Sequence, residues 1–436
     1  MRRKRKNMKK RILIYPCGTE IGLEVYRSMN KSTHYEIWGG SCSYDHGRFV
    51  YENHIDELPY IVDASTSREV ERFDEIIREY DFDYIYPSMD GVLTVFAKYR
   101  EKLKPIVIAP DIETAEITRS KKKTYQILKN FIPTPDIYTE PSAFPVFLKP
   151  DSSQGAVGTK LIYTRHELNE AIKKNRNLLI LEYLPGREYT VDCFTNLSGE
   201  LIYAEARERK RIKNGISVNT MFKYNPTFIE YANKINAIIR QKGAWFFQMK
   251  EDKNGNLKLL EVASRIAGTS AISRIAGVNL PLLTIHLYDG NEIDSVIMNP
   301  GYKALELDRA LYNCFCWDIS YDTVYVDYDD TLIVDGKVNV ELISFLYQSV
   351  NEQKKIILLT KHDGNIMTSL SRWKIKELFD EIILLENNAH KSDYVKQNSI
   401  FIDDSYGERR EVFERCDVPV FDTHMIEGLM KGKNHI

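Results

Sequence analysis

Short apolar runs alternate with helix-like segments in two separate stretches of this chain of 436 residues. In the first stretch, the apolar runs lie at residues 11–16, 84–87 and 106–109. In the second, they lie at residues 323–326, 355–360, 381–385, 399–402 and 418–421. Strands that alternate with helices are typical of parallel sheets, because a parallel connection needs a crossover that a helix usually supplies. The sequence therefore predicts one parallel α/β sheet in each stretch.

The region between these two stretches has a different texture. Short strands are expected at residues 146–149, 178–183, 189–194 and 201–204, and helices at residues 228–242 and 280–288. Strands and helices without regular alternation indicate an α+β domain. The predicted organisation is a basic tail (1–10), a Rossmann-like domain (11–115), an α+β domain (116–300), a linker (301–320) and a C-terminal α/β domain (321–436).

The composition is that of a globular protein, with 43% hydrophobic and 28% charged residues and a net charge of −2. No apolar run is long enough to span a membrane, and no apolar segment follows the basic start. The six cysteines are too sparse for a disulfide scaffold, so we expect reduced thiols and no zinc site. These features predict a cytoplasmic protein with neither membrane nor nucleic acid as a partner. We assign the basic tail no function.

Lysines and glycines of the α+β domain are suited to binding a triphosphate. Lys121 and Lys149 lie on separate predicted elements and can contact phosphate oxygens from two sides. Gly155 and Gly158 lie in a hairpin whose backbone N–H groups can approach phosphates where a Cβ atom would obstruct them. The two lysines that follow Lys121 compete with it, and a solvated lysine cluster is the alternative to a phosphate site.

Polar residues near predicted strand ends can supply further ligands. Glu182 ends an apolar strand, and Leu184 lies in the turn that leads to Glu188. An acidic acceptor such as Glu188 suits the hydroxyl groups of a sugar. Gln248 and Glu261 flank an Asn-Gly turn on strands that should pair, so both can offer oxygen atoms to Mg²⁺.

In this order and spacing, these segments of residues 11–295 resemble the ATP-grasp superfamily, particularly the large subunit of carbamoyl-phosphate synthase. The resemblance implies ATP with Mg²⁺ or Mn²⁺ as cofactors and a nucleotide-binding lid at about residues 120–190. It implies that Glu182 and Leu184 meet the adenine edge and that Glu188 accepts hydrogen bonds from the ribose. Gln248 and Glu261 would be the metal ligands, and Lys121 fits the spacing of the family better than its neighbours.

Two arginines also match the family. Arg265 falls where the family places a cation that stabilises the transferred phosphoryl group, and Arg211 best matches the loop that recognises the substrate carboxylate. A charged edge strand is the alternative for Arg211. One departure is Ala263, where the family often has Asn. Ser88 and Asp90 are further candidates, because ligands of open α/β sheets bind at the carboxyl ends of strands.

The C-terminal stretch places polar residues at the ends of predicted strands, namely Asp327, Asp329, Thr360, Lys391, Asp403 and Asp404. This series resembles the haloacid dehalogenase (HAD) superfamily. The resemblance implies that Asp327 is the nucleophile of an aspartyl-phosphate mechanism and Asp329 the general acid and base. Thr360 and Lys391 would hold the phosphoryl oxygens. Asp404, or alternatively Asp403, would bind Mg²⁺ with Asp327 and Asp329.

The segments between these motifs are too short to contain an inserted cap domain, so the expected site is open. The two resemblances predict a bifunctional enzyme. Its ligase half would join a small-molecule carboxylate to an amine through an acyl phosphate, and its phosphatase half would act on a phosphorylated small molecule. A homodimer is compatible with the sequence. In one alternative, the ATP-grasp half binds nucleotide without ligation; in another, the HAD half is a phosphotransferase or a scaffold.

Overall fold

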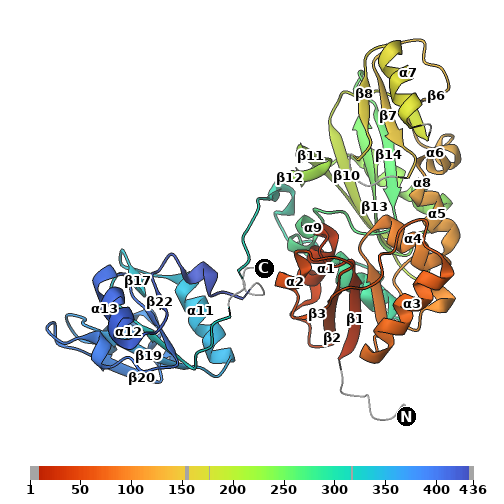
Figure 1. Ribbon diagram of the computed structural model, residues 1–436. Coiled ribbons are helices and arrows are strands. Elements are labelled where there is room, and N and C mark those ends of the chain that lie inside the picture. The colour runs from red at the N-terminus through yellow and green to blue at the C-terminus, as the bar shows by residue number, and fades with distance from the viewer. Residues whose placement is uncertain (1–8, 153–156, 176, 316–317, 432–436) are drawn as a thin grey trace. The chain divides into compact units, whose positions relative to one another are not determined.

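The computed structural model describes residues 9–152, 157–175, 177–315 and 318–431 (Figure 1). The chain divides into two compact units, Met1–Leu311 and Tyr312–Ile436. We describe each unit by itself. No helix in the described part of the chain is long and apolar enough to cross a membrane.

Unit 1 begins with a parallel sheet, as predicted, which has five strands in the order β3-β2-β1-β4-β5; β2 and β3 were not predicted. The strands are β1 (Lys10–Tyr15), β2 (Tyr35–Gly40), β3 (Asn53–Ile55), β4 (Tyr84–Pro87) and β5 (Ile106–Val107). Helices α1 (Glu20–Met29) and α2 (Gly47–Val50) lie on one side of the sheet, and α3 (Ser67–Ile77) and α4 (Asp90–Lys98) on the other (Figure 1). Buried residues of α3 and α4, including Phe73 and Phe96, pack on Leu13 and Ile85. The carboxyl ends of β1 and β4 lie side by side.

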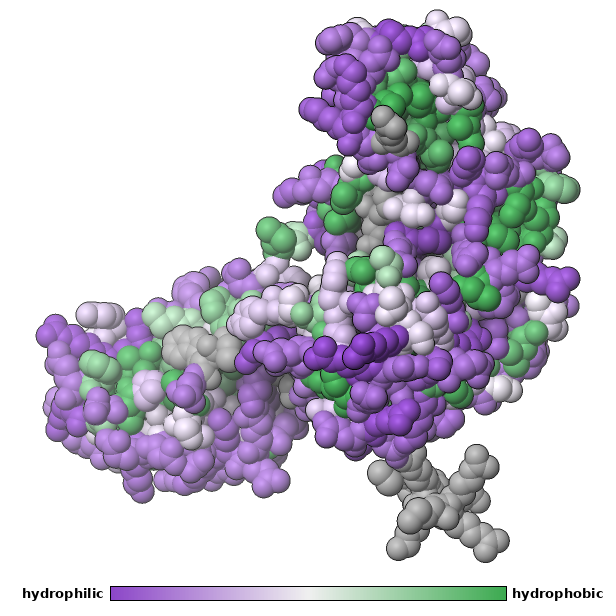
Figure 2. Space-filling view, turned by 45° about the vertical axis from the view of Figure 1, so that its right-hand side comes forward, coloured by the Kyte–Doolittle hydropathy of each residue, from purple (hydrophilic) through white to green (hydrophobic). Residues whose placement is uncertain are grey.

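The rest of unit 1 contains two antiparallel sheets. The smaller has the order β6 (Ile137–Tyr138), β9 (Leu178–Glu182), β7 (Val146–Pro150) and β8 (Lys160–Ile162). With α7 (Arg165–Lys174) it lies within residues 120–190, for which a lid is predicted, and Figure 2 shows hydrophobic side chains gathered on this lobe. The larger has the order β14 (Leu257–Ala263), β13 (Gly243–Glu251), β10 (Glu188–Thr195), β11 (Leu201–Lys213), β12 (Ile216–Phe222) and β15 (Glu306–Asp308).

Helices complete this α+β region, namely α5 (Ile112–Arg119), α6 (Lys121–Leu128), α8 (Pro226–Ile238), α9 (Ala271–Ile275) and α10 (Leu280–Tyr288). Buried Phe228, Ala232 and Ile235 of α8 belong to the same hydrophobic core as Trp245 and Phe247 of β13. This core fixes the position of β13, and β14 pairs with β13. The prediction of an α+β region is confirmed.

The prediction of a linker over residues 301–320 is wrong in its first part. Strand β15 adds to the edge of the large sheet, where Leu307 pairs with Thr220 of β12. Arg309 forms an ion pair with Glu20 at 2.7 Å. An edge strand leaves backbone N–H and C=O groups unpaired, and β15 satisfies them on β12. Residues 301–311 therefore belong to unit 1.

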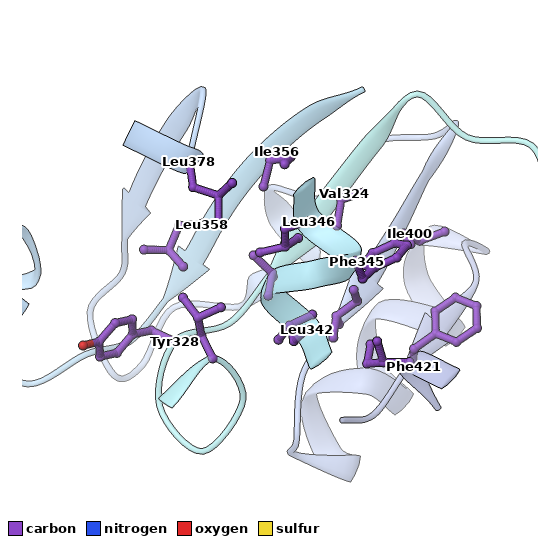
Figure 3. Packing of buried hydrophobic residues seen from close by; sticks show 14 of the residues in the cluster. Val324, Tyr328, Leu342, Phe345, Leu346, Ile356, Leu358, Leu378, Ile400 and Phe421 are labelled. Atoms are coloured by element: carbon purple, nitrogen blue, oxygen red, sulfur yellow. The ribbon is translucent and has the colours of Figure 1, made fainter. Parts of the chain in front are cut away.

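Unit 2 contains a second parallel sheet of five strands in the order β20-β19-β16-β21-β22, again as predicted. The strands are β16 (Thr323–Val326), β19 (Lys355–Thr360), β20 (Glu381–Leu384), β21 (Ser399–Ile402) and β22 (Val420–Phe421). Helices α11 (Val340–Asn351), α12 (Ile366–Trp373) and α13 (Tyr406–Cys416) cover it, and β17 (Ile333–Val334) and β18 (Lys337–Val338) form a hairpin. Phe345 and Leu346 of α11 lie against Val324, Ile356 and Ile400 of the sheet (Figure 3).

The segments between the polar residues of unit 2 are short, as expected. Residues 327–391 are all described, and they contain the β17–β18 hairpin, α11, β19, α12 and β20. This range holds no further domain. The carboxyl end of the sheet is therefore not covered by an inserted cap from this range.

Candidate functional site

A cavity of about 320 Å³ is lined by residues of both antiparallel sheets of unit 1. Its walls include six residues that the sequence predicted for nucleotide or metal binding, namely Lys149, Glu182, Leu184, Glu188, Gln248 and Glu261. Apolar Phe147 and Leu181 of the lid line the same cavity. The volume and the mixed apolar and charged walls are typical of a small-molecule site.

The charged end of this cavity is built on Glu261. Gln248 and Glu261 are directly opposite each other on β13 and β14, which confirms that they lie on paired strands. Lys149 places its Nζ atom 3.5 Å from Oε2 of Glu261. Burial alone would raise the pKa of Glu261, but the charges of Lys149 and Lys121 outweigh it and lower this pKa. The carboxylate therefore stays ionised and can take part in binding a cation.

Lys121 is buried at the start of α6, close enough to Lys149 for the two charges to interact. Burial, and then repulsion from Lys149, lower the pKa of Lys121 to about 8. Its Nζ atom donates to the backbone oxygen of Asp151 at 3.3 Å. Two lysines beside one carboxylate leave a local excess of positive charge, which favours an anion such as phosphate.

The glycine-rich hairpin is described only in part. Gly155 lies outside the described residues. Gly158 has a φ of +75°, and a Cβ atom there would lie 2.8 Å from the side chain of Pro150. Both the backbone conformation and the space therefore require glycine at this position. The predicted approach of hairpin N–H groups to a phosphate stays a prediction.

At the other end of the first cavity, the acidic side chains of Glu182 and Glu188 are paired with cationic side chains. Glu188 contacts Arg209 and Lys250, the latter at 3.3 Å. Glu182 lies 2.7 Å from Lys258. A ribose would therefore meet Glu188 as part of an ion-paired cluster rather than as an isolated acceptor.

Arg209, rather than the predicted Arg211, lies at the cavity. Nη1 of Arg209 donates to Gln248 at 3.1 Å, whereas Arg211 pairs with Asp308 at 2.7 Å and its side chain is 59% exposed. A β-bulge between Arg209 and Arg211 breaks the alternation of the strand, so the two arginines do not share one environment. The run of alternating arginines in the sequence marked this strand, but no residue pattern marked the bulge.

A second cavity of about 330 Å³ shares Arg209, Gln248 and Glu261 with the first and extends to the parallel sheet. Arg265 lines it and forms two hydrogen bonds with Asp90, at 2.7 and 2.6 Å. Burial would raise the pKa of Asp90, but Arg265 outweighs it and lowers this pKa. The sequence predicted both residues separately as ligand contacts, and the structure pairs them.

Unit 2 brings three of its predicted residues together at the carboxyl end of the sheet. Asp327 follows β16, and Asp403 follows β21. Nζ of Lys391 lies 2.7 Å from Asp327 and 2.6 Å from Asp403, and all three side chains are buried. Burial raises the pKa of Asp403 to about 6 against the opposing charge of Lys391, and burial likewise raises the pKa of Asp327.

The other predicted residues of unit 2 surround this cluster. Asp404 hydrogen-bonds to Thr331 through both its backbone N–H and its side chain, at 2.8 and 3.1 Å. Thr360 ends β19, and its buried hydroxyl makes no hydrogen bond of standard geometry among the described residues, but it lies close enough to Asp327 to act against the burial that raises the pKa of that carboxyl. The carboxylate of Asp329 is 55% exposed and contacts Nδ1 of His362 at 2.8 Å. The sequence prediction missed His362 and the role of Thr331, although both lie within a few residues of motif positions.

The oxygen atoms at these two places fit a hard divalent cation. Carboxylate oxygens of Asp327, Asp403 and Asp404 lie within 4.8 Å of one another. Gln248 and Glu261 offer an amide and a carboxylate oxygen from adjacent strands. Such oxygen donors suit Mg²⁺. The carboxylate of Asp329 is not part of the clustered set.

Comparisons with known proteins concern unit 1. A family model described as ATP-grasp in the biosynthetic pathway with Ter operon matches residues 174–310. The chain is 25% identical over 266 residues to the 3-methyl-D-ornithine–L-lysine ligase of Methanosarcina acetivorans, covering 58% of this chain and 70% of that protein. The ligase of the same name from Methanosarcina mazei is 25% identical over 182 residues, 41% of this chain. This match spans about half, 48%, of the length of that curated relative.

Solved structures share the fold of unit 1 at low sequence identity. The L-amino acid ligase from Bacillus licheniformis has a TM-score of 0.53 and 16% identity, covering 66% of this chain and 76% of that chain. The biotin carboxylase domain of the Hydrogenobacter thermophilus 2-oxoglutarate carboxylase, in complex with MgADP, ADP and bicarbonate, has a TM-score of 0.53 and 17% identity. This match covers 66% of this chain and 71% of that chain. Residues 174–310 therefore match an ATP-grasp family model, and unit 1 shares the fold of these solved structures.

Proposed function

We propose that unit 1 is an ATP- and Mg²⁺-dependent ligase that joins a carboxylate to an amine. The observation that carries the proposal is the adjacency of the two cavities, one lined by Lys149 and Glu182 and the other by Arg265, which share Arg209, Gln248 and Glu261. The first has the apolar walls and lysines that suit a nucleotide, and the second has room for a further substrate. Because Gln248 and Glu261 line both cavities, the nucleotide and the further substrate would both lie beside one metal position.

The chain's own residues would contribute positioning and charge to this reaction. Lys121 and Lys149 would bind phosphate oxygens, and Glu261 with Gln248 would hold Mg²⁺, which neutralises phosphate charge when bound. Arg265 would stabilise the charge on the transferred phosphoryl group. The substrate carboxylate would gain the γ-phosphoryl group as ADP leaves, and the amine would then displace phosphate from the acyl group and release a proton.

The nature of both substrates is supported by the relatives. Two of them are named for the joining of 3-methyl-D-ornithine to L-lysine, and a structural neighbour is an L-amino acid ligase. We therefore infer that the carboxylate and the amine are amino acids or close derivatives. ATP with Mg²⁺ agrees with neighbours solved with MgADP.

A substrate-dependence assay tests this function. The purified chain should form ADP and phosphate only when ATP, Mg²⁺, a carboxylate and an amine are all present, and mass spectrometry should detect the condensed product. Nucleotide binding without ADP formation from any mixture of amino acids would instead favour the alternative of a non-ligating nucleotide-binding module.

Arg209 and Arg211 allow a matched test of which arginine contacts the substrate carboxylate. Arg209→Met should lower kcat/KM for ADP formation about 100-fold, because it removes a buried guanidinium from the wall and leaves Glu188 with one cation fewer. Arg211→Met should change it less than about threefold, because Arg211 forms an exposed ion pair with Asp308. Steady-state kinetics on the two variants measure the difference. Equal losses would contradict the choice of Arg209.

We further propose that unit 2 is a HAD-like phosphohydrolase with an open site. The observation that favours it is the buried contact of Lys391 with Asp327 and Asp403. Asp327 would attack the phosphoryl group, and Asp329, oriented by His362, would protonate the leaving oxygen. Asp404 or Asp403, with Asp327, would hold Mg²⁺, which offsets repulsion between the carboxylate and the phosphate. Thr360 has a hydroxyl available for a phosphoryl oxygen.

The two activities would then act in one pathway. Unit 2 would remove a phosphate from the substrate or from the product of the ligation by unit 1. A fused chain raises the effective concentration of a shared intermediate. Phosphotransfer to an acceptor other than water is the alternative for unit 2, and product analysis with added alcohols separates the two.

A further inference from the structure

A third cavity, of about 230 Å³, lies in the Rossmann-like part of unit 1. Thr19 and Met89 line both this cavity and the second one, so the two cavities are neighbours at the start of α1. Buried apolar side chains of Tyr15, Ile61 and Val92 contribute to its wall. A ligand seated at the second cavity can therefore extend an apolar chain into this one.

One acidic residue, Asp45, lines this apolar cavity. Its Oδ1 atom accepts hydrogen bonds from the backbone N–H of Gly47 and the hydroxyl of Ser41, both at 2.9 Å. No described residue donates to Oδ2 or forms an ion pair with this half-buried carboxylate. Carboxylates in such places are usually paired, so a cationic ligand group would complete the site.

The position of Asp45 is built into the surrounding chain. A Cβ atom at residue 18 would lie 2.3 Å from Cγ of Asp45, so the loop before α1 needs Gly18 to admit this carboxylate. A Cβ atom at residue 47 would lie 3.0 Å from its Oδ1 atom. Gly18 and Gly47 therefore leave the space that this carboxylate occupies, and the two hydrogen bonds to Oδ1 hold it there.

The two neighbouring histidines do not supply the missing positive charge at neutral pH. Burial lowers the pKa of both His46 and His54, which keeps these rings neutral. Cys17, His54 and Asp45 could also form a metal site, since their ligating atoms lie within 4.8 Å of one another. However, the hydroxyl of Ser41 hydrogen-bonds to all three, at 3.1, 3.0 and 2.9 Å. These hydrogen bonds already satisfy the three groups, which favours a hydrogen-bonded cluster over a metal site.

We propose that this cavity binds the ammonium-bearing side chain of a basic amino-acid substrate, with Asp45 as the specificity-determining residue. The inference rests on the proposed ligase function. The aliphatic part of the side chain would contact Ile61 and Val92, and its ammonium group would donate to the free Oδ2 atom of Asp45. The relatives agree in chemistry, because ornithine derivatives and lysine both carry such a side chain.

Cys42 gives a direct reporter of occupancy, because it is half-buried and lines the same cavity. The experiment follows iodoacetamide labelling of Cys42 by peptide mass spectrometry in the full chain, with L-lysine or L-norleucine added. Norleucine has the same carbon chain as lysine but lacks the ammonium group of the side chain. Lysine should protect Cys42 at a concentration at least about tenfold lower than norleucine, as expected for a charge-assisted hydrogen bond.

Asp45→Asn should remove this preference for lysine. The lysine concentration that protects Cys42 should rise about tenfold or more, and the norleucine concentration that protects Cys42 should not change. Glu57→Gln is the matched control, because Glu57 is exposed and makes no described contact, and it should behave as the unaltered chain. The comparison of the two ligands on the unaltered chain does not depend on the folding of a variant.

Equal protection by lysine and norleucine, or lysine protection that survives Asp45→Asn, would overturn the proposal. Protection by Zn²⁺ but not by lysine would overturn it in favour of a metal site. Labelling needs no turnover, so it separates this inference from the ligase function. If amino acids drive ADP formation but lysine does not protect Cys42, only the side-chain site fails. If lysine protects Cys42 while no mixture drives ADP formation, the ligase proposal fails and the site stands.

Discussion

Replacing Lys149 by alanine should lower kcat/KM for substrate-dependent ADP formation by about 1,000-fold, or about 4 kcal/mol of transition-state stabilisation. Lys149 is positioned at the cavity wall 3.5 Å from Glu261, where we place the phosphates. Its removal takes away a phosphate contact and also a charge that lowers the pKa of Glu261. Steady-state kinetics with coupled ADP detection measure the loss.

Two controls separate this effect from misfolding and from general loss of charge. Lys122→Ala should retain nearly full activity, because Lys122 is exposed on α6 and lines neither cavity. Thermal unfolding of Lys149→Ala should stay cooperative. Full turnover by Lys149→Ala, or an equal loss in Lys122→Ala, would contradict the assignment of the phosphate site.

Asp327→Asn should abolish the Mg²⁺-dependent hydrolysis of an aryl phosphate, a loss of about 1,000-fold or more, because an amide cannot act as the nucleophile that forms an aspartyl-phosphate. The amide oxygen can still accept the hydrogen bond from Lys391, which contacts Asp327 at 2.7 Å. The fold of unit 2 should therefore persist. Release of p-nitrophenol measures the loss.

Asp335→Asn is the matched control for this substitution. Asp335 is an exposed carboxylate near the β17–β18 turn, and asparagine tolerates its φ of 48°. The Asp335→Asn variant should hydrolyse the aryl phosphate at the same rate as the unaltered chain. Hydrolysis that survives Asp327→Asn would refute Asp327 as the nucleophile, and the ligase activity of unit 1 should be unchanged by either variant.

The sequence predicted both parallel sheets and most of their strands, because these strands are buried runs with helices between them, but it did not predict β2 and β3. The strands β16 and β21 and the residues that follow them, Asp327 and Asp403, lie as expected, since parallel strands bring their carboxyl ends to one edge. The pairing of Gln248 with Glu261 was also predictable, because an Asn-Gly turn joins their strands.

Other features depend on contacts that no local pattern encodes. The bulge that separates Arg209 from Arg211 depends on how β11 pairs with β12. The addition of β15 to the large sheet depends on an open edge far away in the sequence. The ion pair of Arg265 with Asp90 joins the segment after β14 to the start of α4, and the Asp45 cavity is defined by residues of several segments. Such long-range arrangements appear only in the folded chain.

The central claim is that unit 1 activates a carboxylate as an acyl phosphate. The most direct measurement uses amino acids labelled with ¹⁸O in the carboxyl group, ATP and Mg²⁺, on the Asp327→Asn background so that unit 2 adds no hydrolysis. Mass spectrometry of the released phosphate reports the label. The account predicts one ¹⁸O atom in the phosphate for each condensed product. Unlabelled phosphate, or AMP with pyrophosphate in place of ADP, would contradict it.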